Sequence, residues 1–106
     1  MHLEPASFEK ILSWQKTVEV RLNDEKRKLL KVDDIIEFEN DDGEVLPCKI
    51  IKFSYFKSFE DLFSSATYLL RAWWTTKEES ISAMYKFYTP EQEKELGVVA
   101  IEIEGV

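Results

Sequence analysis

Cysteine and histidine are nearly absent from the sequence, which has Cys48 and His2 as its single examples. One cysteine cannot form an internal disulfide, so we expect Cys48 to be a small buried hydrophobic residue. One histidine, near the start of the chain, argues against a Ser-His-Asp or Cys-His triad and against a zinc site built from histidine and cysteine. We accordingly predict no metal site and no cofactor.

Glycine, proline and long hydrophobic runs are also scarce. Three glycines and three prolines are scattered singly among 106 residues, so no linker divides the chain, and we predict one domain over residues 1–106. No apolar run approaches the roughly 20 residues of a membrane span, and no basic and then apolar segment follows Met1. We expect no membrane association and a cytoplasmic location.

Positive charge is in the minority, since the net charge is −7. That balance argues against a generic binder of duplex DNA, whose affinity comes from neutralising phosphates. The charge is unevenly distributed, however. Residues 1–31 hold seven Lys or Arg against five Asp or Glu, whereas residues 32–106 hold seven against sixteen. Lys26 and Arg27 lie in the more basic part and would suit a rim that faces phosphate.

The pattern of apolar residues predicts an α+β domain. A helix is expected to start at Pro5, and Asn40-Asp41-Asp42-Gly43 is typical of a hairpin turn. Further helices are expected after Ser58, Thr76 and Thr89, which can act as N-caps. The late return of a strand after these helices predicts a closed or nearly closed sheet. The predicted strands are Thr17–Leu22, Ile35–Glu39, Val45–Phe53 and Val98–Glu104, the last with one face buried.

The strand that follows Lys16 carries the candidate site. Val18, Val20 and Leu22 fall on one face of it, and Thr17, Glu19 and Arg21 fall on the other. An acid and a base side by side on the polar face suggest the floor of a pocket, which Lys16 can join only from the turn that enters the strand. The alternative is an exposed ion pair that contributes roughly 0–1 kcal/mol.

Several segments resemble the ASCH domains of the PUA-like superfamily. They are residues 8–11, 13–21, 31–38, 55–62, 84–93 and 97–101. The resemblance implies a small antiparallel or mixed β-barrel with flanking short helices. Two residues depart from the family pattern, because Trp14 and Asp33 stand where the family usually has glycine. If the first of these turns needs a positive φ, we expect that the helix instead continues through Trp14 or that its indole covers the pocket.

Three functions remain open. The first is binding of RNA or a nucleobase, nucleoside or nucleotide in a cleft, with Tyr55, Trp73, Trp74, Tyr85 and Tyr88 as stacking candidates that also fit core positions. The residues expected to bind are Lys16, Thr17, Glu19, Arg21, Asn23, Lys26 and Arg27. The third is a protein interaction module, in which the Trp73-Trp74 segment forms a homodimer surface or a surface for another partner.

The second function, implied by the resemblance, is a small metal-independent amidohydrolase that acts on N4-acetylcytidine. Lys16 matches the catalytic lysine of those enzymes, whereas Glu19 stands at the position of their threonine nucleophile. A carboxylate cannot form the ordinary acyl ester, so Glu19 would act as a general base on water. Lys16 and Glu19 are therefore the catalytic candidates, and enzyme activity itself is left open.

Overall fold

The computed structural model describes residues 1–72 and 76–106 as an α+β domain, which confirms the predicted fold class. All strand pairs are antiparallel, in the order β1-β4-β3-β2. The elements in chain order are α1 (Pro5–Leu12), β1 (Val18–Leu22), α2 (Glu25–Lys28), β2 (Ile35–Glu39), β3 (Val45–Phe56), α3 (Phe59–Phe63), α4 (Ala66–Arg71), α5 (Lys77–Met84), α6 (Pro90–Leu96) and β4 (Val98–Gly105). Within these ranges no helix is long and apolar enough to cross a membrane.

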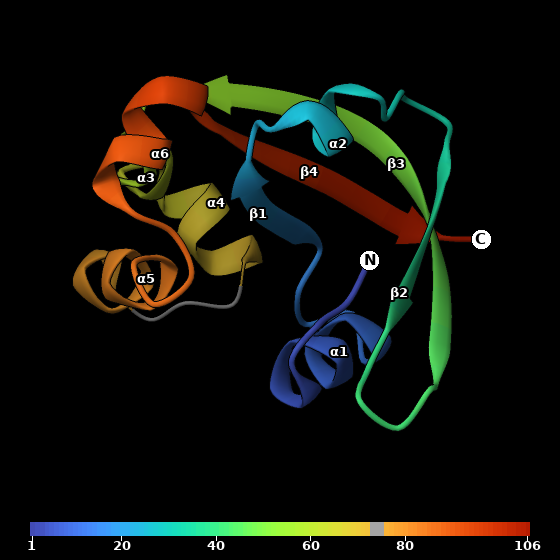
Figure 1. The fold of residues 1–106 in the computed structure, drawn as a ribbon. Coiled ribbons are helices and arrows are strands. Elements are labelled where there is room, and N and C mark those ends of the chain that lie inside the picture. Colours follow the sequence, from blue (N-terminus) through green and yellow to red (C-terminus); the bar gives the residue numbers. More distant parts are fainter. Residues whose placement is uncertain (73–75) are drawn as a thin grey trace.

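The sheet is curled into a half-barrel, with β1 and β2 as its two edges (Figure 1). A bulge between Ile50 and Lys52 shifts the register of β3 against β4, and bulges of this kind bend a strand. The N-terminal residues run beside β2, where the amide of Leu3 donates to the carbonyl of Glu39 at 2.8 Å. The sheet order leaves β1 with one free edge, and that edge positions the site described below.

Two hydrophobic clusters lie on opposite faces of β4. Val99, Ile101 and Ile103 pack with α1, β2 and β3. Val98 and Ala100 pack with β1, α3 and Ala72. The prediction that only one face of this strand is buried was therefore wrong. Strand β4 is central in the sheet, and helices that come from distant parts of the sequence cover its second face.

The helices begin where the sequence predicts. The side chains of Ser58, Thr76 and Thr89 each accept a hydrogen bond from the backbone amide three residues later. Thr89 and Gln92 form a complete capping box.

Trp14 and Asp33, which replace the usual family glycines, both have a positive φ, 59° and 75° respectively. Helix α1 ends at Leu12, so it does not continue through Trp14. The indole instead packs at Gly105, where an added Cβ would lie 3.1 Å from Cζ2 of Trp14. Both expectations for Trp14 were wrong. The left-handed turn is kept at a cost of about 1–2 kcal/mol, and the indole contacts the end of β4 rather than the pocket.

Candidate nucleotide-binding site

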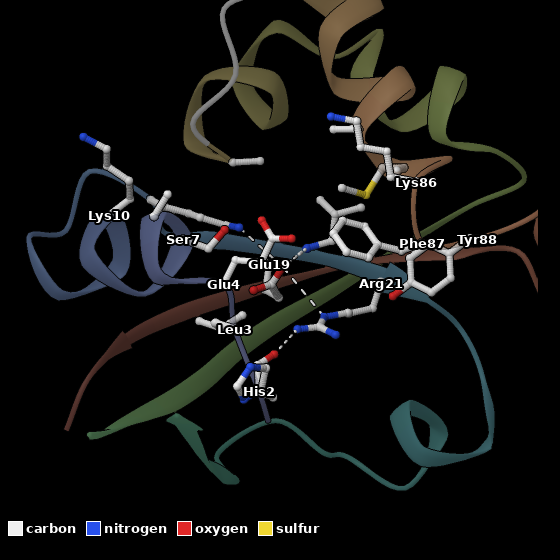
Figure 2. A pocket seen from close by; sticks show the side chains of 16 residues that line it. His2, Leu3, Glu4, Ser7, Lys10, Glu19, Arg21, Lys86, Phe87 and Tyr88 are labelled. Atoms are coloured by element: carbon white, nitrogen blue, oxygen red, sulfur yellow. Dashed lines mark hydrogen bonds and ion pairs between the residues drawn. The ribbon is translucent and has the colours of Figure 1, made fainter. Parts of the chain in front are cut away.

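A pocket of about 600 Å³, which we call the edge pocket, lies along the free edge of β1. Figure 2 shows Glu19 at its centre, with residues of α1 on one side and Lys86, Phe87 and Tyr88 on the other. Its lining comes from residues 2–10, from residues 16–21, and from Ala72 together with residues 83–88. The lining residues are His2, Leu3, Glu4, Ala6, Ser7, Lys10, Lys16, Glu19, Val20, Arg21, Ala72, Ala83, Met84, Lys86, Phe87 and Tyr88.

Glu19 is a buried carboxylate whose two oxygens differ in their surroundings. Its Oε1 accepts a hydrogen bond from the amide of Val20 at 3.1 Å and lies 3.4 Å from Nζ of Lys16 and 3.8 Å from Nε of Arg21. Its Oε2 is also buried but has no hydrogen-bond partner among the described residues. A buried acceptor without a partner costs about 1–3 kcal/mol. Glu19 therefore keeps one acceptor for which the described protein supplies no donor.

Lys16 reaches Glu19 from the turn before β1, as the sequence predicts. The amides of Gln15 and Lys16 both donate to the carbonyl of Lys10, at 2.9 Å each, which closes the turn after α1. The Lys16 side chain is itself only 10% exposed. The Lys16 ammonium and the Glu19 carboxylate lie 3.4 Å apart, so each compensates the buried charge of the other.

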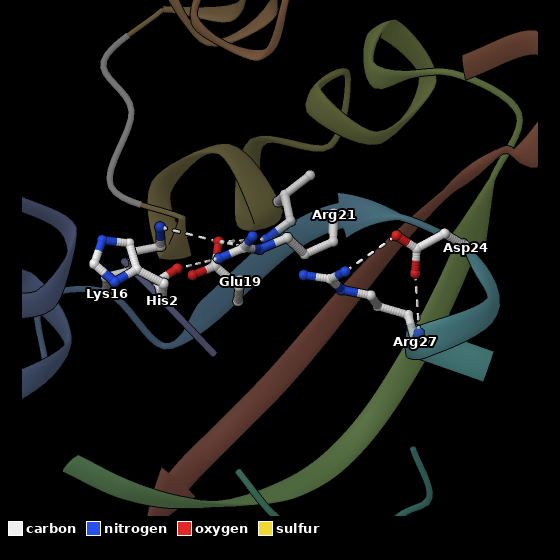
Figure 3. A network of polar contacts seen from close by, with 7 residues as sticks. His2, Lys16, Glu19, Arg21, Asp24 and Arg27 are labelled. Carbon is white, nitrogen blue, oxygen red and sulfur yellow. Dashed lines mark hydrogen bonds and ion pairs between the residues drawn. The ribbon is translucent and has the colours of Figure 1, made fainter. Parts of the chain in front are cut away.

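Arg21 connects the polar floor to the N-terminal segment. Its Nη2 donates to the carbonyl of His2 at 3.0 Å, while its Nε faces Glu19 (Figure 3). The Arg21 side chain is 18% exposed, so this is not the solvent-exposed ion pair that was the alternative interpretation. The predicted convergence of Lys16, Glu19 and Arg21 is present in the structure.

The wall opposite α1 is mostly apolar apart from Lys86, and it includes an aromatic residue that the sequence reasoning missed. Phe87 lines the edge pocket and is 57% exposed, which is unusual for a phenylalanine. Tyr88, one of the predicted stacking candidates, also lines the pocket but stacks on Phe59 with ring centroids 5.9 Å apart. The available signal was the position of Phe87 just beyond α5, within a family-like segment. Tyr55 and Tyr85 do not line the pocket, and the predicted Trp73-Trp74 surface lies outside the described residues.

A second depression, which we call the basic hollow, adjoins the edge pocket. It has a volume of about 490 Å³ and is lined by Met1, His2, Arg21, Lys26, Arg27, Leu30 and Ile36. Lys26 and Arg27, predicted as a phosphate-facing rim, thus line this hollow and not the edge pocket. Arg27 Nη1 lies 3.0 Å from Asp24 Oδ2, whereas its Nε is buried and has no hydrogen-bond partner among the described residues.

Two other predicted binding residues line neither depression. Thr17 belongs to a separate polar cluster, where its Oγ1 accepts from Nε of Arg71 at 3.1 Å and the same arginine pairs with the buried Glu102. The amide of Asn23 donates to the carbonyl of Gly97, beyond the end of β1. The alternation of side chains along a strand predicted Thr17 on the same face as Glu19. The regular strand, however, begins only at Val18.

Glu93 holds the aromatic wall in place from behind. Its Oε2 accepts from the amide of Phe59 at 2.7 Å, and its Oε1 accepts from the hydroxyl of Tyr85 at 2.6 Å. This hydrogen bond to Glu93 is the main cause that raises the pKa of Tyr85 to about 12. Because Tyr85 precedes Phe87 by two residues, the contact fixes the segment that carries the wall.

The remaining chemistry-bearing groups do not extend the site. Cys48 is buried, and desolvation raises the pKa of its thiol to about 11, which makes it a poor nucleophile at neutral pH. In the part of the chain that the structure describes, no three His, Cys, Asp or Glu side chains are arranged to hold a metal ion.

Comparisons with known proteins agree with this fold. A family model described as "ASCH domain" matches residues 1–106. The crystal structure of a hypothetical protein, PH0355, is 32% identical, with a TM-score of 0.87 over 100% of this chain and 96% of that one. The solution structure of protein PF0455 from Pyrococcus furiosus is also 32% identical, with a TM-score of 0.74 over 98% and 96%. A crystal structure of ASCH from Zymomonas mobilis, 16% identical, has a TM-score of 0.61 over 98% and 64%. No curated protein matches.

Proposed function

Because the chain belongs to the ASCH domain family, whose PUA-like fold generally binds RNA, we propose that the edge pocket receives one base of a single-stranded RNA or of a nucleoside. The observation that carries this proposal is the unpartnered Oε2 of Glu19. Glu19 lines the edge pocket, so a donor that enters the pocket can approach its carboxylate. A base with an exocyclic amine supplies the donor that this carboxylate lacks.

The rest of the edge pocket suits a base. Its volume of about 600 Å³ lies within the usual range of roughly 300–1,000 Å³ for small-molecule sites. The exposed ring of Phe87 offers a surface for stacking, which typically contributes about 1–3 kcal/mol per base. Lys16 and Arg21 supply donors for a base carbonyl beside the amine. Cytosine, which presents an amine next to a ring nitrogen and a carbonyl, matches this arrangement, whereas uracil has no amine to offer Glu19.

The test compares five-residue single-stranded RNAs of cytidine and of uridine by fluorescence anisotropy. The wild-type protein should bind the cytidine strand more tightly, by about tenfold, since a donor to a buried carboxylate forms a charge-assisted hydrogen bond. Glu19→Gln should weaken that preference by about fivefold, because the amide oxygen can still accept a hydrogen bond but not a charge-assisted one. Glu104→Gln is the matched control, because Glu104 is exposed near the end of β4 and lines neither depression. Equal affinity of the wild type for both strands, or no binding, would contradict the proposal.

Arg21→Ala provides a second variant. It should abolish binding and leave the fold nearly intact, because Arg21 donates to one backbone carbonyl and packs against Glu19 at the edge of the sheet. Urea unfolding measures the second part of this expectation. If Arg21→Ala is unfolded at room temperature, Arg21 is a structural residue and the pocket loses its central group.

A second candidate function is hydrolysis of an N4-acylated cytosine, and the 3.4 Å contact between Lys16 and Glu19 favours it. In this reaction Glu19 would remove a proton from water, the hydroxide would attack the acyl carbon, and Lys16 or Arg21 would stabilise the oxyanion. The C–N bond would break as the proton passes from Glu19 to N4, which releases a carboxylic acid and cytosine.

Turnover of N4-acetylcytidine by the purified protein tests this reaction. Glu19→Gln should lower kcat by about 10²-fold or more, the scale of losing a general base. Glu19→Thr, which restores the family residue, should raise activity if the surroundings of Lys16 suit a hydroxyl nucleophile. Turnover that survives Glu19→Gln, or that a chelator abolishes, would exclude this mechanism.

A further inference from the structure

We propose that the edge pocket and the basic hollow form one two-part site, in which the base enters the edge pocket and a phosphate on the same nucleotide enters the basic hollow. This inference rests on the proposed function, because it assumes that a base occupies the edge pocket. It goes further by naming the ligand as a phosphorylated nucleoside and by assigning separate residues to the phosphate.

The two depressions are contiguous. His2 and Arg21 line both of them. Arg21 lies at the boundary, with its Nε facing Glu19 of the edge pocket and its Nη2 on the carbonyl of His2 (Figure 3). A guanidinium has five N–H donors. The hydrogen bond to His2 and the ion pair with Glu19 involve two of its three nitrogens, so the guanidinium has donors beyond these two contacts.

Carboxylates line the edge pocket but not the basic hollow, and this difference favours the phosphate in the hollow. The edge pocket is lined by four cationic side chains, those of Lys10, Lys16, Arg21 and Lys86, but also by two carboxylates, those of Glu4 and the buried Glu19, which repel an anion placed beside them. The basic hollow is lined by three cationic side chains, Arg21, Lys26 and Arg27, and its lining includes no Asp or Glu. A phosphate is therefore favoured in the hollow and disfavoured beside Glu19.

The surroundings of Arg27 independently support a phosphate in the basic hollow. Its Nε is buried and has no hydrogen-bond partner among the described residues, although its Nη1 is paired with Asp24. The Arg27 side chain is 14% exposed, so its charge is largely desolvated and only partly compensated. A phosphate oxygen is an acceptor to which the N–H groups of a guanidinium edge donate well.

The size of the molecule's basic region limits the number of phosphates that it can hold. Three cations line the hollow, and the protein as a whole carries a net charge of −7. A long polyanion would meet repulsion beyond the hollow. The site thus suits one or two phosphates, in a free nucleotide or in one step of a single-stranded RNA.

The experiment measures affinities by isothermal titration calorimetry for cytidine, cytidine 5′-monophosphate, cytidine 3′-monophosphate, the dinucleotide CpC and inorganic phosphate. We expect at least one phosphorylated probe to bind about tenfold or more tightly than cytidine, the effect of one charge-assisted hydrogen bond. Lys26→Gln should reduce that gain to about threefold or less and leave cytidine affinity unchanged. The matched control is Lys57→Gln, because Lys57 is exposed and lines neither depression.

The outcomes separate this inference from the proposed function. Cytidine that binds as tightly as every phosphorylated probe, or a phosphate gain that Lys26→Gln leaves intact, would overturn the two-part site while the base pocket stands. A monophosphate that binds no more tightly than inorganic phosphate, or no binding by any probe, would overturn both. If CpC gains and the monophosphates do not, the phosphate comes from RNA; the reverse result identifies a free nucleotide.

Discussion

Replacement of Glu93 by glutamine tests whether this buried carboxylate stabilises the fold. The carboxylate accepts two short hydrogen bonds, from the amide of Phe59 and from the hydroxyl of Tyr85. Glutamine can keep both, because its carbonyl can accept from the amide and its NH₂ can donate to the hydroxyl, which also accepts. Two charge-assisted bonds become neutral ones, at about 1 kcal/mol each. We therefore expect Glu93→Gln to lower the free energy of unfolding by about 2 kcal/mol.

Urea unfolding followed by tryptophan fluorescence measures this change, and Tyr85→Phe serves as the partner variant. Tyr85→Phe removes one of the two bonds and leaves the other in place. The double variant should be less destabilised than the sum of the single variants, because contacting residues are coupled. An unfolding free energy of Glu93→Gln within about 0.5 kcal/mol of the wild type, the range of ordinary surface substitutions, would refute the reasoning.

The same contact predicts a pH dependence. The pKa of Tyr85 is raised from 10.0 to about 12, first by the hydrogen bond to Glu93. The native state therefore holds the phenol proton more tightly than the unfolded state. The linked stabilisation is fully present below pH 10 and is lost as the pH rises towards 12. Between these values the wild type should lose stability more steeply than Glu93→Gln, and absorbance at the tyrosinate band should show Tyr85 ionising at lower pH in the variant.

Three further predictions concern other parts of the molecule. Trp14→Gly should be more stable than Trp14→Ala by about 1 kcal/mol, because both lose the indole but only alanine keeps a Cβ at positive φ; equal urea midpoints would show that the turn is not strained. Cys48 should react with a thiol reagent only after unfolding, because it is buried and its thiol pKa is about 11; rapid labelling of the native protein would contradict this. RNA affinity should fall with salt with a log–log slope of roughly −1, as expected for one or two neutralised phosphates of a single strand; a salt-independent affinity would exclude the participation of Lys26 and Arg27.

The sequence predicts well those features that depend on residues a few positions apart in the chain. The turn at residues 40–43 follows from the tolerance of asparagine, aspartate and glycine for tight turns, and Gly43 indeed has a φ of 80°. The N-caps of α3, α5 and α6 depend on one side chain and an amide three residues away. The approach of Lys16 to Glu19 spans only three residues, and the geometry of a turn that enters a strand was enough to predict it.

The features that sequence reasoning missed depend on contacts between distant residues. Whether one or both faces of β4 are buried depends on where α3 to α5 pack, which alternation within the strand cannot show. Phe87 enters the edge pocket because α5 and the residues after it lie near β1, more than sixty residues earlier in the chain. Thr17 was placed at the site by strand parity, but Arg71 holds it elsewhere.

The N-terminal segment has a practical consequence for how the protein should be labelled. Met1 and Leu3 are held beside β2 by backbone hydrogen bonds to Glu39, and His2 lines both depressions. A fluorophore or affinity tag attached ahead of Met1 would therefore sit at the mouth of the site and compete with the ligand that it is meant to report. Val106 is exposed and lines neither depression, so it is the suitable point of attachment for immobilisation. A dye attached ahead of Met1 would instead be displaced from the site when the ligand binds, so its signal would report binding.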